Sequence, residues 1–147
     1  MKYDFKFNKI LFVKEREKEE ALSIYNESVK KFEEVAEKLY ELLKKKEDLE
    51  EFQSNRLVHG LSVQEVRYHQ HFIGNLENLI NHQQKMVMNA RNRMFLYQEK
   101  LLEKNIEVKK LEKIREKDLN LFVEDLKATE NKQMDDISIQ HFMSRGS

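Results

Sequence analysis

Two long heptad segments are separated by one short break, His59-Gly60-Leu61-Ser62, and this break decides the fold. Gly60 can take the left-handed backbone conformation that commonly ends a helix. Ser62 and Glu65 have the spacing of a capping box, in which each side chain satisfies a free backbone N–H at the start of a helix. The break therefore predicts the end of one helix and the start of the next within a few residues.

On both sides of the break, apolar residues recur at alternating intervals of three and four. The first seam contains Leu22, Tyr25, Val29, Phe32, Ala36, Leu39 and Leu43. The second contains Ile73, Leu76, Ile80, Gln83, Val87, Ala90, Met94, Tyr97, Leu101, Lys104, Val108 and Leu111. This period, kept over many heptads, is typical of helices that wrap around a partner helix. The sequence predicts an all-α fold with helices over about 4–58 and 62–130.

The register of the two seams favours a hairpin within one chain. In an antiparallel pair, facing positions have residue numbers with a constant sum. The pairs Leu43 with Leu76, Leu39 with Ile80, Phe32 with Val87, Tyr25 with Met94 and Leu22 with Tyr97 all sum to 119. A parallel dimer would not require this agreement. We therefore expect residues 1–130 to form a long two-helix antiparallel coiled-coil hairpin, in which the second helix extends beyond the first past about residue 115.

The last segment, residues 131–147, departs from the heptad pattern. Asp135 or Asp136 could cap a short helix, and terminal segments often stay disordered. Both alternatives remain open from the sequence, so this segment is treated as a separate tail.

Composition narrows the classes of function. The chain has 27 basic and 27 acidic residues, which leaves no uncompensated basic face for nucleic acid. It has no cysteine, so disulfides and thiol chemistry are excluded. Its mean hydropathy is -0.80, and no apolar run approaches the ~20 residues of a membrane span. These features predict a soluble, cytoplasmic protein.

The residues also lack the patterns of a catalytic or metal site. His69 and His71 are two apart, so on a helix they point in different directions and cannot share one ion. No metal-binding motif, phosphate-binding glycine loop or nucleophile–base pair accompanies them. We therefore expect neither a cofactor nor an enzymatic activity.

A charge-poor segment follows the break. Glu77 is the one charged residue from Tyr68 to Gln84, although 37% of the chain is charged. Large apolar residues flank the seams there, namely Leu42, Leu49, Phe72, Leu79 and Met86, and one helical stripe contains Phe72, Leu76, Leu79 and Gln83. Depletion of charge together with aromatic residues is typical of an interface centre. The alternative is a wider core, with a third helix packing back or with self-association.

Several stretches outside the heptads resemble the flagellar export protein FliJ. The clearest is Tyr68-His-Gln-His-Phe-Ile-Gly-Asn-Leu-Glu-Asn-Leu-Ile. The opening Tyr3-Asp-Phe-Lys-Phe-Asn-Lys-Ile-Leu, the stretch Glu103-Lys-Asn-Ile-Glu-Val-Lys-Lys and Met134-Asp-Asp-Ile-Ser-Ile are similar to Bacillus-type members. The resemblance covers essentially the whole chain.

The resemblance implies a role in the flagellar type III export apparatus, and hence in motility. Members of this family resemble the central stalk of rotary ATPases. They bind the hexameric export ATPase, the cytoplasmic linker of the membrane export-gate protein, and export chaperones. By this resemblance the protein is a monomer that associates peripherally with the cell membrane at the flagellar base.

The resemblance also assigns two partner-binding surfaces. The gate-binding surface comprises Leu42, Leu49, Phe72, Leu76 and Leu79, while Lys38, Lys45 and Gln83 depart from other members. The ATPase-binding end comprises Phe5, Phe7, Leu11, Leu119, Phe122 and Leu126. A second hypothesis is a self-associating coiled-coil scaffold unrelated to export. Mass in solution separates the two, because the hairpin predicts a monomer near 17.9 kDa.

Overall fold

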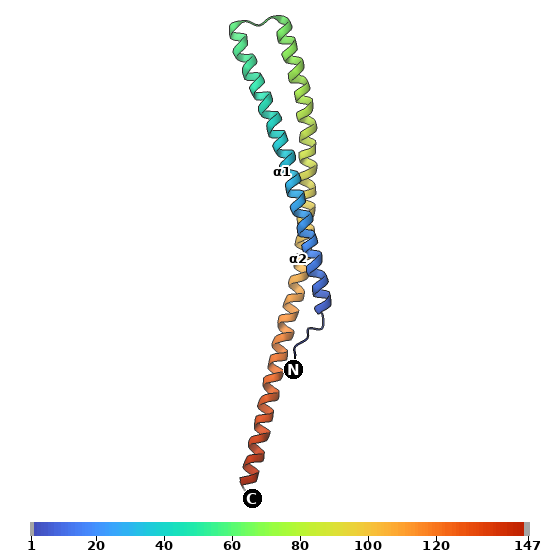
Figure 1. Ribbon diagram of the computed structural model, residues 1–147, viewed down its shortest axis with the longest axis vertical. Helices are drawn as coiled ribbons and strands as arrows, with labels where there is room; N and C mark the ends of the chain where they lie inside the picture. The colour runs from blue at the N-terminus through green and yellow to red at the C-terminus, as the bar shows by residue number, and fades with distance from the viewer. Residues whose placement is uncertain (1, 146–147) are drawn as a thin grey trace. The chain divides into compact units, whose positions relative to one another are not determined.

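The computed structural model describes residues 2–145 and contains two long helices in that range, with no strand. Helix α1 spans Asn8–His59 and helix α2 spans Val63–Arg145. The chain reverses between them, so the helices pack against each other as a hairpin (Figure 1). The predicted all-α helical hairpin is confirmed.

The turn has the left-handed glycine and the Ser62 half of the predicted capping box. Gly60 has a φ of +92°, in the left-handed region that side chains with a Cβ rarely adopt. The Ser62 hydroxyl accepts a hydrogen bond from the backbone N–H of Glu65 at 3.2 Å, as an N-cap residue does. The Glu65 carboxylate pairs with Arg56 across the turn at 3.9 Å. One residue therefore ends α1 and another starts α2.

The outer ends of the helices differ from the expected boundaries. Helix α1 begins at Asn8, whose N–H is bonded to the carbonyl of Phe5 at 3.1 Å, and residues 2–7 form a non-helical lead-in that ends in a turn. Helix α2 continues through the segment expected to be a tail, up to Arg145. The end of that tail, residues 146–147, lies outside the described residues, and the division of the chain at residue 130 stays a prediction.

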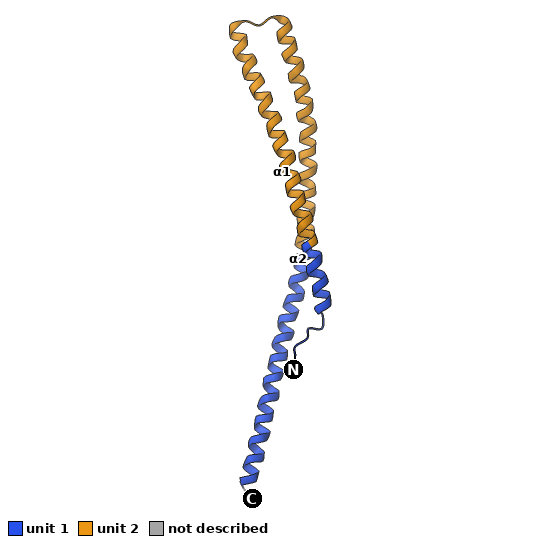
Figure 2. Ribbon diagram, in the orientation of Figure 1, with its two compact units in different colours: residues 1–19, 103–147 blue, residues 20–102 orange. Residues whose placement is uncertain are grey.

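The chain forms two compact units, which Figure 2 colours separately. Unit 1 contains Met1–Glu19 and Glu103–Ser147, and unit 2 contains Glu20–Leu102 with the turn. Each unit therefore contains part of both helices.

Unit 2 is held by a thin seam. Its buried residues are Leu76, Ile80, Gln83 and Ala90, all of them on α2 at the predicted 3-4 spacing. The facing residues of α1 are half-buried. Buried Gln83 donates a hydrogen bond from Nε2 to the carbonyl oxygen of Val35 at 3.0 Å, which satisfies its amide across the seam.

The predicted α1 seam was wrong at two residues, Leu22 and Leu43, and Leu22 is 43% exposed. Leu43, expected in the seam, is 42% exposed, whereas Leu42 and Leu49 are half-buried. Beyond Leu39 a 3-4 pattern can continue through either Leu42 or Leu43, and the structure follows Leu42. The half-buried Lys46 then lies in the seam and reaches Glu77 of α2 at 3.4 Å.

The antiparallel register is close to the predicted one. Cross-helix contacts in unit 2 join Val35 to Gln83, Lys46 to Glu77, Phe52 to His69 and Arg56 to Glu65. Their residue numbers sum to 118–123, against the predicted 119. Facing side chains of two packed helices interleave, so a spread of a few residues is expected.

The buried residues of unit 1 form one cluster. Phe5, Leu11 and Val108 form a buried cluster, and Tyr3, Phe7 and Leu111 pack against it. Because Phe5 belongs to the lead-in, the segment before α1 is held against α2 by apolar burial.

Candidate partner-binding surfaces

The first surface lies on α2 close to the turn, within unit 2. Phe72 is 39% exposed and Leu79 is 55% exposed, and both lie in the charge-poor segment. Tyr68, one turn before Phe72, is exposed as well. The Nζ of Lys45 on α1 lies 5.9 Å from the centre of the Phe72 ring, so a cation borders this surface. These residues present apolar area to solvent on a helix that is otherwise well solvated.

The other predicted members of this surface face inward. Leu76 is 4% exposed, so its side chain belongs to the interhelical core. Leu42 and Leu49 are half-buried against α2. The stripe expected from Phe72 to Gln83 is therefore divided, because Leu76 and Gln83 point into the seam. The side chains that pack beneath this surface are Leu42, Leu49 and Leu76. Only Phe72 and Leu79, of the predicted members, are exposed and can contact a partner.

The second surface lies in unit 1, where the lead-in covers α2. Tyr3 donates a hydrogen bond from its hydroxyl to Asp118 Oδ2 at 3.0 Å. Its ring lies 5.3 Å from that of Phe122, centre to centre. Phe5 and Leu11 are buried in the core. The structure thus uses most of the predicted residues of this end to hold the lead-in in place.

What unit 1 leaves exposed is the far part of α2. Phe7, Phe122 and Leu126 are half-buried, whereas Leu119 is exposed. Further exposed apolar residues follow along the same helix: Leu121, Val123, Met134, Ile137, Ile139, Phe142 and Met143. Unit 1 therefore offers apolar contacts from α2, beyond the residues that the lead-in covers.

A ring of four charges ties α1 to α2 in unit 1. Glu17 accepts hydrogen bonds from Lys104 at 3.1 Å and from Lys14 at 3.4 Å. Glu107 pairs with Lys14 at 3.2 Å and with Lys104 at 3.8 Å. The Lys104 ammonium lowers the pKa of the Glu17 carboxyl, and the Glu107 carboxylate raises the pKa of Lys14. Each cation lies between two anions, so the ring of four charges is neutral.

Neither surface contains the elements of a reaction site. No cluster of metal-ligating side chains occurs in the described part of the chain. Likewise, no helix in residues 2–145 has the length and apolar character needed to cross a bilayer.

Sequence reasoning missed Tyr3 as an organising residue of unit 1. Tyr3 lies outside the heptad pattern, and its contact with Asp118 spans most of the chain, so no local signal reveals it. The exposed Leu121 was also missed, because it lies outside the predicted seam.

Comparison with known proteins gives one consistent result. The model of the flagellar FliJ protein family matches residues 2–147. The flagellar FliJ protein of Bacillus subtilis strain 168 is 54% identical over 146 residues, which cover 99% of each chain. No solved structure matches the chain significantly.

Proposed function

Since the chain belongs to the flagellar FliJ family and is a non-enzymatic component of flagellar export, we propose that it couples the export ATPase to the export gate. In this role the protein acts as a stalk. Unit 1 contacts the ATPase hexamer, and the turn-proximal part of unit 2 contacts the cytoplasmic linker of the gate protein. The protein works as a monomer in the cytoplasm, peripherally bound at the flagellar base, and it also assists export chaperones.

The observation that carries the proposal is the exposure of Phe72 and Leu79. Both are large apolar side chains with no charged residue between them except Glu77. They lie on a helix whose inner face is fixed by buried Leu76. Buried apolar anchors at the centre of an interface carry most of the binding energy, and a rigid backbone lowers the cost of presenting them.

The proposed ATPase contact uses the exposed part of α2 in unit 1. Leu119 is exposed and Leu126 is half-buried, and neither belongs to the buried cluster of Phe5, Leu11 and Val108. These two leucines can therefore be changed while the core of unit 1 stays intact. Phe5 and Leu11 support this end from inside.

The proposal is tested with two double variants of the full chain and two assays. Phe72→Asp with Leu79→Asp should abolish binding to the cytoplasmic region of the gate protein and leave stimulation of the ATPase unchanged. Leu119→Asp with Leu126→Asp should show the opposite pattern. Each variant is the control for the other, and circular dichroism checks that helix content is kept. If both variants keep gate binding and ATPase stimulation, the proposal is overturned. An oligomeric mass for the free chain would also overturn it.

A further inference from the structure

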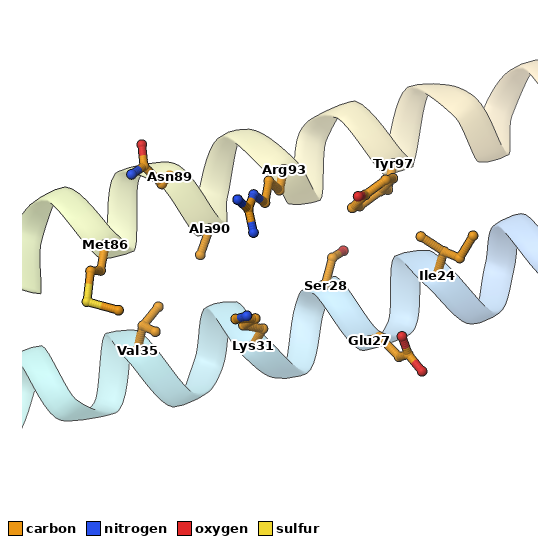
Figure 3. A pocket seen from close by; sticks show the side chains of 10 residues that line it. All are labelled: Ile24, Glu27, Ser28, Lys31, Val35, Met86, Asn89, Ala90, Arg93 and Tyr97. Carbon is orange, nitrogen blue, oxygen red and sulfur yellow. The ribbon is translucent and has the colours of Figure 1, made fainter.

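A groove lies between the two helices of unit 2, farther from the turn than the gate-binding surface. Its volume is about 350 Å³. Figure 3 shows that its walls come from both helices, with Ile24 and Val35 on α1 and Met86 and Tyr97 on α2. The lining also includes two small side chains, Ser28 on α1 and Ala90 on α2, which Figure 3 shows at different levels along the helices. Small side chains beside the seam leave space that larger ones would fill.

Two cations line the groove without a carboxylate partner. Lys31 lies on α1 and Arg93 on α2, and neither forms an ion pair with any residue in 2–145. In Figure 3 the Arg93 side chain extends into the space between the helices, whereas Glu27 lies at the outer edge of α1. The lining therefore presents positive charge beside apolar walls.

The sequence of α2 explains why Arg93 is unpaired. Residues 78–98 contain no Asp or Glu, whereas Lys85, Arg91 and Arg93 lie among them. Six turns of helix thus carry three cations and no anion. This contrasts with unit 1, where Glu17 and Glu107 neutralise the facing lysines. A coiled coil usually pairs opposite charges beside its seam, so this positive edge is available to an external anion.

We propose that this groove binds an acidic amphipathic helix of a partner protein. The groove is bordered by two helices and is open to solvent. In a helical bundle, a third helix packs into such a groove between two others. Apolar side chains of the partner helix pack between Ile24, Met86 and Tyr97, and carboxylates along its flank pair with Lys31 and Arg93. Helix-in-groove recognition uses this combination of apolar anchors and complementary flanking charge.

The groove is separate from the proposed gate contact. Phe72 and Leu79 do not line it, and neither does any residue of unit 1. Failure of the gate or ATPase contacts would leave this inference standing, and the reverse also holds.

The test uses a designed helical peptide as the probe. The peptide has about 20 residues, roughly 30 Å of helix, with leucines on one face and glutamates on both flanks. A matched peptide has glutamine in place of every glutamate. Fluorescence anisotropy with the full-length chain should show saturable binding of the acidic peptide and at least about tenfold weaker binding of the neutral one. Equal affinity for the two peptides would overturn the proposal.

Charge reversal locates the binding site. Lys31→Glu with Arg93→Glu should weaken binding of the acidic peptide at least about tenfold. The matched control, Lys30→Glu with Lys44→Glu, makes the same change in net charge at two exposed residues outside the groove and should bind almost as the parent does. If both double variants lose affinity equally, the attraction comes from net charge and the assigned site is wrong.

A variant that fills part of the groove tests its shape independently of its charge. Ser28→Leu places a larger apolar side chain in the groove and leaves both cations in place. The hydroxyl it removes is bonded to the Tyr25 carbonyl of the same helix at 2.6 Å, so helix content should be kept. We expect loss of peptide binding at unchanged circular dichroism, and unchanged affinity would overturn the proposal. If the free chain forms dimers that Lys31→Glu with Arg93→Glu abolishes, the occupant is a second copy of this chain.

Discussion

Unit 1 and unit 2 contain parts of the same two helices, yet they use their side chains differently. In unit 1 the buried residues come from the lead-in, from α1 and from α2, namely Phe5, Leu11 and Val108. In unit 2 the buried residues Leu76, Ile80, Gln83 and Ala90 come from α2 alone. Unit 1 therefore has a closed three-sided core, and unit 2 has a thin seam between two helices.

Both units contain ion pairs between the helices, including Lys46 with Glu77 in unit 2, but the groove of unit 2 differs in charge pairing from the core of unit 1. In unit 1 the facing lysines and glutamates neutralise one another across the helices. In unit 2 the groove cations Lys31 and Arg93 have no carboxylate partner in the described residues, and Phe72 and Leu79 are exposed. The lysines of this ring in unit 1 are therefore neutralised by glutamates, whereas the two groove cations of unit 2 are not. Both units also expose apolar side chains, such as Leu119 in unit 1 and Phe72 in unit 2, so the two units differ mainly in how their buried residues are supplied.

The largest predicted difference concerns a core leucine of unit 1 and an exposed leucine of unit 2. Leu11 is 2% exposed, so Leu11→Ala should lower the free energy of unfolding by about 2–5 kcal/mol through lost burial and a residual cavity. Leu79→Ala removes the same atoms from an exposed position and should change it by less than about 0.5 kcal/mol. Urea unfolding followed by circular dichroism measures both values.

Amide hydrogen exchange shows which residues are destabilised by Leu11→Ala. Faster exchange after Leu11→Ala should be concentrated in residues 2–19 and 103–122. Similar destabilisation by the two alanine variants would remove the distinction between a closed core and an exposed binding face.

A smaller change in the free energy of unfolding is expected at Gln83, the buried polar residue of the unit 2 seam. Gln83 is 3% exposed and donates to the carbonyl oxygen of Val35. Gln83→Ala loses this bond and leaves a cavity, so it should cost about 1–3 kcal/mol. Gln83→Leu keeps the volume and removes the buried amide, and it should be neutral within about 1 kcal/mol. Equal losses in the two variants would mean that the hydrogen bond, rather than packing, holds the seam here.

The sequence predicted the parts of this fold that depend on short-range spacing. The seam of α2 follows from its 3-4 pattern, and the turn follows from Gly60 and Ser62, because each depends on residues within one or two helical turns. The predicted α1 seam was wrong at Leu43, since a leucine lies both three and four residues after Leu39.

The details of the candidate surfaces could not be predicted in the same way. Whether Leu76 faces solvent or the seam depends on a rotation of about one residue, and periodicity alone allowed both. The contact of Tyr3 with Asp118 joins residues from opposite ends of the chain, so no local pattern encodes it. The groove at Ser28 and Ala90 requires the register of both helices, which sequence gives only to within a few residues.

The smallest predicted effect is on the pH dependence of stability. It tests whether the ring of four charges stabilises unit 1 through charge pairing. The pKa of Glu17 is lowered by Lys104, so the carboxylate form stabilises the folded state, and this contribution is present above the ordinary pKa of about 4.5. It is lost as the pH falls through the lowered pKa. The pKa of Lys14 is raised by Glu107, so its contribution is present below about 10.5 and is lost as the pH rises through the raised pKa.

Between these limits Glu17→Gln should therefore be less stable than the parent chain, and the gap should close as the pH falls through the lowered pKa of Glu17, because the parent then loses the same charge. Urea midpoints at pH 7, 5 and 3 measure this gap, and high salt should narrow it at pH 7 by screening. Glu116→Gln is the matched control, since Glu116 is exposed in unit 1 and forms no ion pair with the residues that the structure describes. A gap that stays constant from pH 7 to pH 3 would show that Glu17 acts through packing of its side chain, and the electrostatic contrast between the two units would then rest on unit 2 alone.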